Sequence, residues 1–215
     1  MSPLFPRHVD GLVRTIQSDL ARLGGDTGLT AFLKGIIRDR AFRAVCTFRL
    51  EAAASKGPTR PLYWIAHVAH TVSSSLAGLD LPSETTIGPG LRVFHGRGLV
   101  INGASRLGSN VSLFGGVTIG RRDRIDPDGS RRTLGAPTIG DNVWIGPNAI
   151  VVGPVTVGEG ARIAGGATVF RDLEPRCIFA GNPGAVVRAN APIDVMYPAS
   201  LPMNPQIGNE ACVAE

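Results

Sequence analysis

The sequence is poor in cysteine and in aromatic residues, and it has no long uninterrupted apolar run. Its three cysteines, Cys46, Cys177 and Cys212, are far apart and lack the spacing of a metal site, which predicts reduced thiols in a cytoplasmic protein. With two Trp, two Tyr and no long Lys/Arg run, the net charge of +5 does not indicate nucleic acid. It favours a polyanionic ligand such as a nucleotide cofactor. The longest apolar stretch, 61–79, contains two histidines and three consecutive serines, so we expect no membrane span.

A six-residue repeat fills the middle of the chain. Aliphatic residues recur at this spacing, small residues often follow them, and a further small or branched residue comes four positions later. The spacing fits neither the period of a helix nor that of an ordinary strand. A short repeat rich in glycine and branched aliphatics is typical of a parallel β-helix built from hexapeptides, with one aliphatic per side pointing inward. The clearest aliphatic positions are Ile101, Leu107, Leu113, Ile119, Ile139, Ile145, Val151, Val157, Ile163 and Val169.

The pattern divides the chain into three regions. Residues 1–79 show helical spacing, including one segment over 30–55, and predict a small α-helical N-terminal region without the pattern of a secretory leader. Residues 80–188 form the predicted mainly β domain. Residues 189–215 carry no repeat and contain several prolines, so we expect an extended tail.

The repeat is interrupted twice. The first interruption widens the spacing between Val93 and Ile101 to eight residues, and the second widens the spacing between Ile119 and Ile139 to twenty. We interpret the second as one eighteen-residue turn plus two residues, with the polar segment 121–136 leaving the coil as a loop. Because departures from a regular pattern tend to fall at functional sites, both interruptions mark a candidate site.

The first interruption contains His95, the only histidine in the repeat region. Asp80 lies fifteen residues earlier, close to the length of one coil, so we expect the two side chains about one layer apart. A carboxylate behind an imidazole fixes its tautomer and stabilises its charged form, which makes the histidine a better general base. Asp80 and His95 are therefore a candidate catalytic pair, and a purely structural histidine is the alternative.

Three stretches of the chain resemble one known family. They are 81–101 (LPSETTIGPGLRVFHGRGLVI), 137–169 (PTIGDNVWIGPNAIVVGPVTVGEGARIAGGATV) and 180–187 (AGNPGAVV). With the repeat and the spacing of Asp80 and His95, they make residues 30–187 similar to the serine acetyltransferase family of hexapeptide acyltransferases. The resemblance implies a left-handed parallel β-helix, acetyl-CoA as donor, and a homotrimer with active sites between neighbouring solenoids. It leaves open whether two trimers pair through the helices.

The resemblance also assigns roles to individual residues. It implies that His95 takes the proton from an acceptor hydroxyl, which attacks the thioester directly, and that Asp80 orients His95. It implies neither a cysteine nucleophile nor a metal. The residues implied to contact the pantetheine arm of coenzyme A are Gly120, Gly146 and Ala164, and those implied to contact its phosphates are Arg121, Arg122 and Arg162. Arg131 and Arg132 are candidates to contact either the phosphates or the acceptor. Phe94 is a candidate to contact the acceptor.

Two positions depart from the serine-specific members of that family. Phe94 stands where they carry an aspartate before the histidine, and Gly135-Ala136 stand where they carry an Arg-His pair before Pro137. The changes remove charged partners that the ammonium and carboxylate groups of serine need on leaving water. The Phe94 ring suits the apolar face of a sugar instead. Because the stretch 95–102 is similar to the exopolysaccharide branch of the family, we expect a sugar or polysaccharide-precursor hydroxyl as acceptor, with L-serine as the alternative.

Other protein classes fit the pattern less well. A γ-type carbonic anhydrase shares the solenoid but needs several histidine ligands on adjacent coils to hold zinc, and the repeat region contains His95 alone. A non-enzymatic trimeric scaffold has no need of an interruption at His95. The sequence ends at Glu215 and not at the isoleucine with which family members dock onto cysteine synthase, so we expect no such docking.

Overall fold

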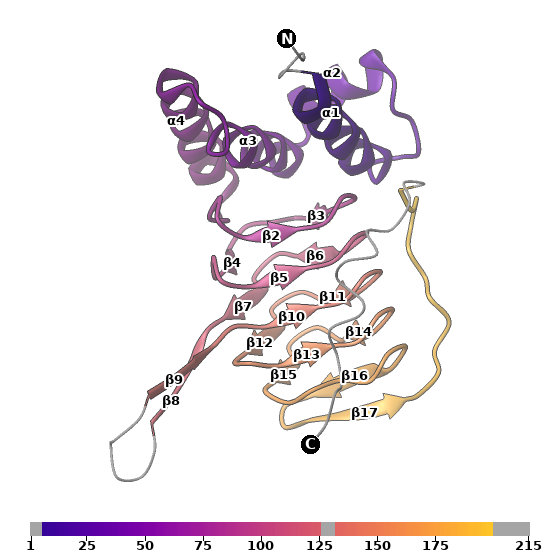
Figure 1. Ribbon diagram of the computed structural model, residues 1–215. Coiled ribbons are helices and arrows are strands. Elements are labelled where there is room, and N and C mark those ends of the chain that lie inside the picture. Colours follow the sequence, from indigo (N-terminus) through magenta and orange to yellow (C-terminus); the bar gives the residue numbers. More distant parts are fainter. Residues whose placement is uncertain (1–5, 126–131, 200–215) are drawn as a thin grey trace.

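The computed structural model describes residues 6–125 and 132–199. In this part of the chain, four helices lie at one end of a parallel β-solenoid and cover its first coil (Figure 1). The helices are α1 (Pro6–Ala21), α2 (Leu29–Arg38), α3 (Arg40–Ala54) and α4 (Arg60–Ala77). The predicted fold class, a mainly β hexapeptide solenoid after a helical N-terminal region, is confirmed.

The strands of the solenoid form three sheets, one on each side, whose successive strands come from successive coils. The first sheet contains β1 (Leu79–Asp80), β4 (Leu99–Ile101), β7 (Thr118–Gly120), β12 (Ile150–Val152) and β15 (Thr168–Val169). The second contains β2 (Thr86–Ile87), β5 (Arg106–Leu107), β10 (Thr138–Ile139) and β13 (Thr156–Val157). The third contains β3 (Arg92–Phe94), β6 (Ser112–Phe114), β11 (Trp144–Ile145), β14 (Arg162–Ile163), β16 (Ile178–Gly181) and the antiparallel β17 (Gly184–Arg188).

The repeat places its aliphatic residues in one continuous core. From Leu107 to Val169, each predicted aliphatic position has 0 % of its surface exposed. The small or branched residues four positions later are also buried, as Val143 and Ala161 illustrate. Aliphatic residues of one coil therefore lie on the equivalent aliphatic residues of the next, and the backbone hydrogen bonds between parallel strands keep the coils in register.

Two edges of the solenoid are lined by residues with positive φ angles, where glycine and asparagine meet the least strain. Their N–H groups donate to the preceding segment of the coil, as Asn110 N does to Pro89 O at 2.9 Å and Asn148 N to Gly115 O at 3.0 Å, except that Gly90 N donates to Asp19 Oδ1. The edge between the second and third sheets has Gly90, Asn110, Asn142, Gly160 and Arg176, and the edge between the third and first sheets has Gly98, Gly116, Asn148 and Gly166. These residues let the chain turn tightly without breaking the hydrogen-bond ladder.

The register of the third sheet corrects our interpretation of the second interruption. Trp144 pairs with Ser112, thirty-two residues earlier, and with Arg162, eighteen residues later. The segment between Ile119 and Ile139 is therefore one ordinary six-residue step with fourteen inserted residues, and not an extra turn. Both descriptions add up to twenty residues, so spacing alone did not separate them.

The inserted segment forms a hairpin and not the predicted loop. Strands β8 (Arg122–Ile125) and β9 (Arg132–Gly135) pair in antiparallel fashion, with residues 126–131 outside the described part of the chain. The hairpin leaves the edge between the first and second sheets and projects away from the solenoid (Figure 1). Its strands satisfy each other's backbone groups, so the segment needs no coil to pair with.

A second difference lies in the helical region, where the predicted segment 30–55 is two helices. Asp39 interrupts it with φ −108° and ψ 101°, and its Oδ1 accepts a hydrogen bond from Phe42 N at 3.0 Å. An aspartate in this conformation is a favourable N-cap, because it satisfies a free N–H at the start of the next helix. The chain therefore turns sharply between α2 and α3.

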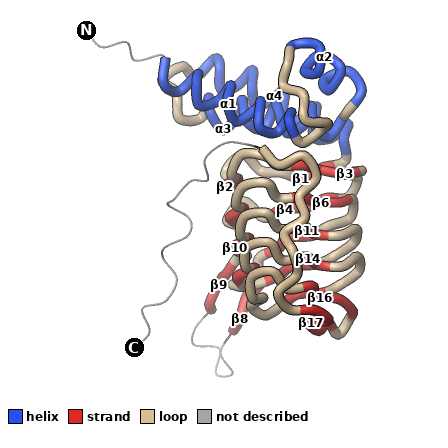
Figure 2. Tube along the Cα trace, turned by 90° about the vertical axis from the view of Figure 1, so that its right-hand side faces the viewer, coloured by secondary structure: helices blue, strands red, loops and turns tan. Residues whose placement is uncertain are grey.

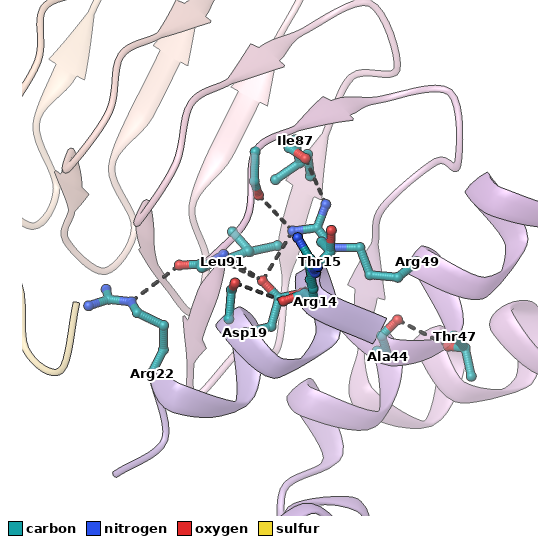
Figure 3. Close-up of polar contacts among 12 residues, drawn as sticks. Arg14, Thr15, Asp19, Arg22, Ala44, Thr47, Arg49, Ile87 and Leu91 are labelled. Carbon is teal, nitrogen blue, oxygen red and sulfur yellow. Dashed lines mark hydrogen bonds and ion pairs between the residues drawn. The ribbon is translucent and has the colours of Figure 1, made fainter. Parts of the chain in front are cut away.

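A buried ionic network joins the helices to the first coil (Figure 3). Arg49 on α3 donates to both carboxylate oxygens of Asp19 on α1, at 2.9 and 3.1 Å, and to the carbonyl oxygens of Ile87 and Gly88 at 2.7 Å each. Asp19 Oδ1 also accepts from Leu91 N at 2.8 Å. Only 1 % of the Asp19 side chain and 7 % of the Arg49 side chain are exposed. The helical region is therefore bonded to the solenoid through charged groups that are almost fully shielded from water.

The described part of the C-terminal tail, 189–199, returns along the solenoid toward the helices (Figure 2). It follows the edge between the second and third sheets: Ala191 N donates to Arg176 O at 2.7 Å, and Ala199 N donates to Asn110 Oδ1 at 2.9 Å. Arg22, the residue after α1, donates to the carbonyl oxygen of Met196. The tail is therefore extended over these residues and bonded at both ends of the solenoid.

Candidate active site

His95 lies at the edge between the third and first sheets, in the corner between β3 and β4. Two extra residues lengthen this corner, since Arg92 pairs with Ser112, twenty residues later. The corner packs on the start of β1: Gly98 N donates to Gly78 O at 2.8 Å. His95 has a φ of 50° and an exposed side chain. The imidazole has no hydrogen-bond partner among the described residues, so it is free to meet a ligand.

Asp80 is the last residue of β1 and pairs with Val100 in the coil that also carries His95. Its side chain is exposed. No hydrogen bond joins Asp80 to His95 within the described part of the chain. The pair therefore stays a prediction, and the structure places its two members on neighbouring coils.

A cleft of about 430 Å³ opens beside His95, between the solenoid and the junction of α2 and α3. Arg92 bridges the two regions, because its Nη1 donates to Asp39 Oδ2 at 2.8 Å. The cleft was not predicted from the sequence, since the helical junction and the β3 corner are far apart along the chain. The lining residues are Arg38, Asp39, Arg40, Ala41, Arg92, Val93, Phe94, His95 and Gly96.

Aromatic rings stack along the outer face of the third sheet below this cleft. The ring centroids of Phe94 and Phe114 are 4.7 Å apart with their planes at 17°, and those of Phe114 and Trp144 are 4.9 Å apart with their planes tilted at 56°. The guanidinium groups of Arg92 and Arg162 lie 4.8 Å from the ring centroids of Phe94 and Trp144 respectively. Phe94, predicted as an acceptor contact, is thus the top ring of a stack that carries a cation at each end.

The residues predicted to contact the pantetheine arm lie at two different edges. Gly146 and Ala164 follow the third-sheet strands of consecutive coils, and Gly146 N donates to Ile163 O at 2.8 Å. Gly120 ends β7 of the first sheet, next to the base of the hairpin. A single chain brings Gly146 and Ala164 together and leaves Gly120 at another edge.

The predicted arginine contacts are likewise dispersed. Arg121 forms an ion pair with Asp123 at 3.2 Å, and the side chain of Arg122 lies against Gly153. Arg162 pairs with Asp194 of the tail at 3.1 Å. Arg131 lies outside the described residues, and Arg132 is placed only as backbone in β9. Arg121 and Arg122 therefore lie at the hairpin and Arg162 lies on the third sheet, so these three arginines do not form one phosphate site within a single chain.

The other predictions concern thiols, metals and membranes. Burial raises the pKa of the Cys46 thiol to about 12 and also raises the pKa of Cys177, so neither is an activated nucleophile. Within residues 6–125 and 132–199, no three His, Cys, Asp or Glu side chains gather as a metal site would require. In that same part of the chain, no helix is both long and apolar enough to cross a membrane.

Comparison with known proteins places this geometry in a family. Residues 136–171 match the model of the bacterial transferase hexapeptide (six repeats). The serine acetyltransferases of Bacillus pumilus and Bacillus subtilis are each 32 % identical over 165 residues, which cover 77 % of this chain and 72 % of each relative. The chain belongs to the serine acetyltransferase family. It is therefore an acyltransferase, as predicted.

Solved structures of the family share the fold. Soybean serine acetyltransferase complexed with serine is 28 % identical with a TM-score of 0.67, and the match covers 83 % of this chain and 71 % of that one. The predicted closeness to the exopolysaccharide branch finds no support in these relatives, all of which are named serine acetyltransferases. Membership was predictable from the repeat and the motif around His95, whereas the branch was inferred from too few positions.

Proposed function

We propose that the protein is a serine O-acetyltransferase that transfers the acetyl group of acetyl-CoA to the hydroxyl of L-serine. The observation that carries the proposal is the exposed His95 at the cleft of a chain whose relatives are named serine acetyltransferases. This reverses the order of the two acceptors that the sequence favoured. The sugar becomes the second candidate.

In the proposed mechanism, His95 accepts the proton of the L-serine hydroxyl through a ring nitrogen. The hydroxyl oxygen attacks the thioester carbon, and the resulting tetrahedral intermediate collapses with loss of the coenzyme A sulfur. The imidazolium returns the proton to that sulfur, so the products are O-acetyl-L-serine and coenzyme A. Asp80 orients His95 and stabilises its charged form. General-base catalysis of this kind contributes about 10²- to 10⁴-fold to the rate.

The working form in this proposal is a homotrimer. The predicted coenzyme A contacts Gly120 and Gly146 lie on two edges of one chain, and they line one site only if the edges belong to neighbouring chains. The projecting hairpin is the part of each chain best placed to reach a neighbour (Figure 1). Light scattering is expected to give a trimer or a multiple of it, and an active monomer would contradict the assembly.

A sugar hydroxyl is a second candidate acceptor because of the aromatic stack. Phe94 offers an apolar ring next to His95, and Phe114 and Trp144 extend that surface along the solenoid. An extended acceptor, such as a polysaccharide precursor, has the length to lie along such a stack. L-Serine is too short to use it.

The deciding experiment measures release of the coenzyme A thiol with L-serine and with a panel of sugars. The proposal expects L-serine to be the best acceptor by kcat/KM. A sugar that exceeds L-serine would establish the second candidate in its place. The His95→Ala variant is expected to lose about 10²- to 10⁴-fold in kcat with either acceptor. A near-normal rate in this variant at saturating acetyl-CoA would remove His95 from the mechanism.

A further inference from the structure

Three arginines from two distant parts of the sequence line the cleft beside His95. Arg38 ends α2, Arg40 begins α3, and Arg92 lies on β3. One carboxylate, Asp39, lines the same cleft and is paired with Arg92. Three positive charges against one negative charge leave an excess of two positive charges next to the candidate base. The cleft is therefore suited to an anionic group.

Arg92 has a donor that the chain leaves unused. Its Nη1 is occupied by Asp39 at 2.8 Å, but its Nε is buried without a hydrogen-bond partner among the described residues. A buried N–H without an acceptor costs free energy, so a ligand oxygen that reaches it is favoured. The ring of Phe94, 4.8 Å from the guanidinium carbon, keeps the arginine in place.

The guanidinium groups of Arg38 and Arg40 are also available to a ligand. Neither side chain forms a hydrogen bond or ion pair within the part of the chain that the structure describes. By contrast, Arg43 on the same helix as Arg40 donates to Ile36 O at 2.8 Å. The break at Asp39 separates α2 from α3, and its two flanking arginines both line the cleft. The helical region therefore contributes charge to the cleft without using that charge for its own stability.

We propose that Arg38, Arg40 and Arg92 bind the carboxylate of the acceptor while its hydroxyl meets His95. The inference rests on the proposed function and names the residues that recognise its substrate. In L-serine two carbon atoms separate the hydroxyl oxygen from the carboxylate carbon, so both groups fit one cleft. Guanidinium groups suit a carboxylate because they donate two parallel hydrogen bonds.

This placement accounts for the missing Arg-His pair at Gly135-Ala136. A zwitterionic acceptor needs a cationic partner for its carboxylate when it leaves water. Here the inserted segment has no cationic side chain directly before Pro137, and the arginines at the junction between α2 and α3 take that role instead. The specificity for an amino acid then depends on the helical region as well as on the solenoid.

The test compares wild type with the double variant R38Q/R40Q and with R92K, which keeps the charge facing Asp39 but loses the Nε donor. Initial rates are measured with L-serine, with L-serinamide, which lacks the carboxylate, and over a range of acetyl-CoA concentrations. The double variant is expected to raise the KM for L-serine at least about tenfold, the scale for lost hydrogen bonds to a charged group. Its kcat/KM for L-serinamide and its KM for acetyl-CoA are expected to stay within about twofold of wild type. R92K is expected to raise the KM for L-serine in the same direction.

Arg60→Gln is the matched control, since Arg60 is exposed at the start of α4 and does not line the cleft. An unchanged KM for L-serine in R38Q/R40Q would overturn the inference. A raised KM for acetyl-CoA with an unchanged KM for L-serine would assign the arginines to cofactor phosphates and also overturn it. The proposed function is judged separately by the wild-type rate with L-serine, so its failure is visible before any variant is compared. Circular dichroism of each variant confirms that the fold is retained.

Discussion

Replacing Asp19 by asparagine tests how the helical region is attached. The carboxylate accepts hydrogen bonds from Arg49 Nε and Nη2 at 2.9 and 3.1 Å and from Gly90 N and Leu91 N at 2.9 and 2.8 Å. The amide removes the negative charge and points an N–H₂ group at one set of donors. Arg49 is then a buried cation without its partner. Removing one member of a buried ion pair costs about 3–5 kcal/mol.

For a chain of this size, each kcal/mol shifts the melting temperature by about 2–4 °C, so Asp19→Asn is expected to lower it by about 6–20 °C. The transition is followed by circular dichroism at the helical signal. Asp194→Asn is the matched control, because Asp194 also pairs with an arginine but its side chain is 75 % exposed. An exposed pair contributes about 0–1 kcal/mol. If Asp19→Asn melts no lower than Asp194→Asn, the buried network does not hold the helices in place.

Two further predictions concern the core and a buried thiol. Ile145 is 0 % exposed and lies between Leu113 and Ile163, so Ile145→Ala is expected to lower the free energy of unfolding in urea by about 2–5 kcal/mol. Ile150→Ala on the outer face is the control, and an equal or larger loss in that variant would contradict the stacked core. Because burial raises the pKa of Cys46 to about 12, the thiol stays protonated at pH 8.5, and mass spectrometry is expected to find it alkylated by iodoacetamide only after unfolding. The raised pKa also means that Cys46 contributes stability below the unfolded thiol pKa of about 8.5 and that this contribution is lost as the pH rises toward 12. Alkylation of Cys46 in the native protein at pH 8.5 would show that the helices open around it.

The fold could be predicted because its packing requires an aliphatic residue at a regular spacing along the sequence. Each inward position, such as Ile145, pairs with its equivalents in the coils before and after, so three steps of the six-residue aliphatic spacing correspond to one coil. An interruption of that period is equally visible, and His95 was found in this way. What the period does not record is how an insertion folds, which is why the segment 121–136 was predicted as a loop although its described residues pair as two antiparallel strands.

The cleft could not be predicted in the same way. Arg40 and Arg92 line the same cleft because the Asp39 cap turns the chain and because Asp19 and Arg49 fix the helices on the first coil. These contacts join segments far apart in the sequence and depend on single side chains, so they leave no repeating signal. An aspartate inside a predicted helix was the one local sign of the turn, since aspartate favours caps over helix interiors.

The path of the C-terminal tail changes how this solenoid is expected to come apart. A repeat protein normally frays from its ends, because a terminal coil has a neighbour on one side only. Here the tail starts beneath the last coil, where Ala191 is bonded to Arg176, and reaches the helices above the first coil through Arg22. The tail thereby connects the last coil to the opposite end of the solenoid through hydrogen bonds. Unfolding of the last coil requires release of the tail, and release of the tail removes the Met196 acceptor from Arg22 at the opposite end. The two ends are therefore expected to unfold together rather than one at a time.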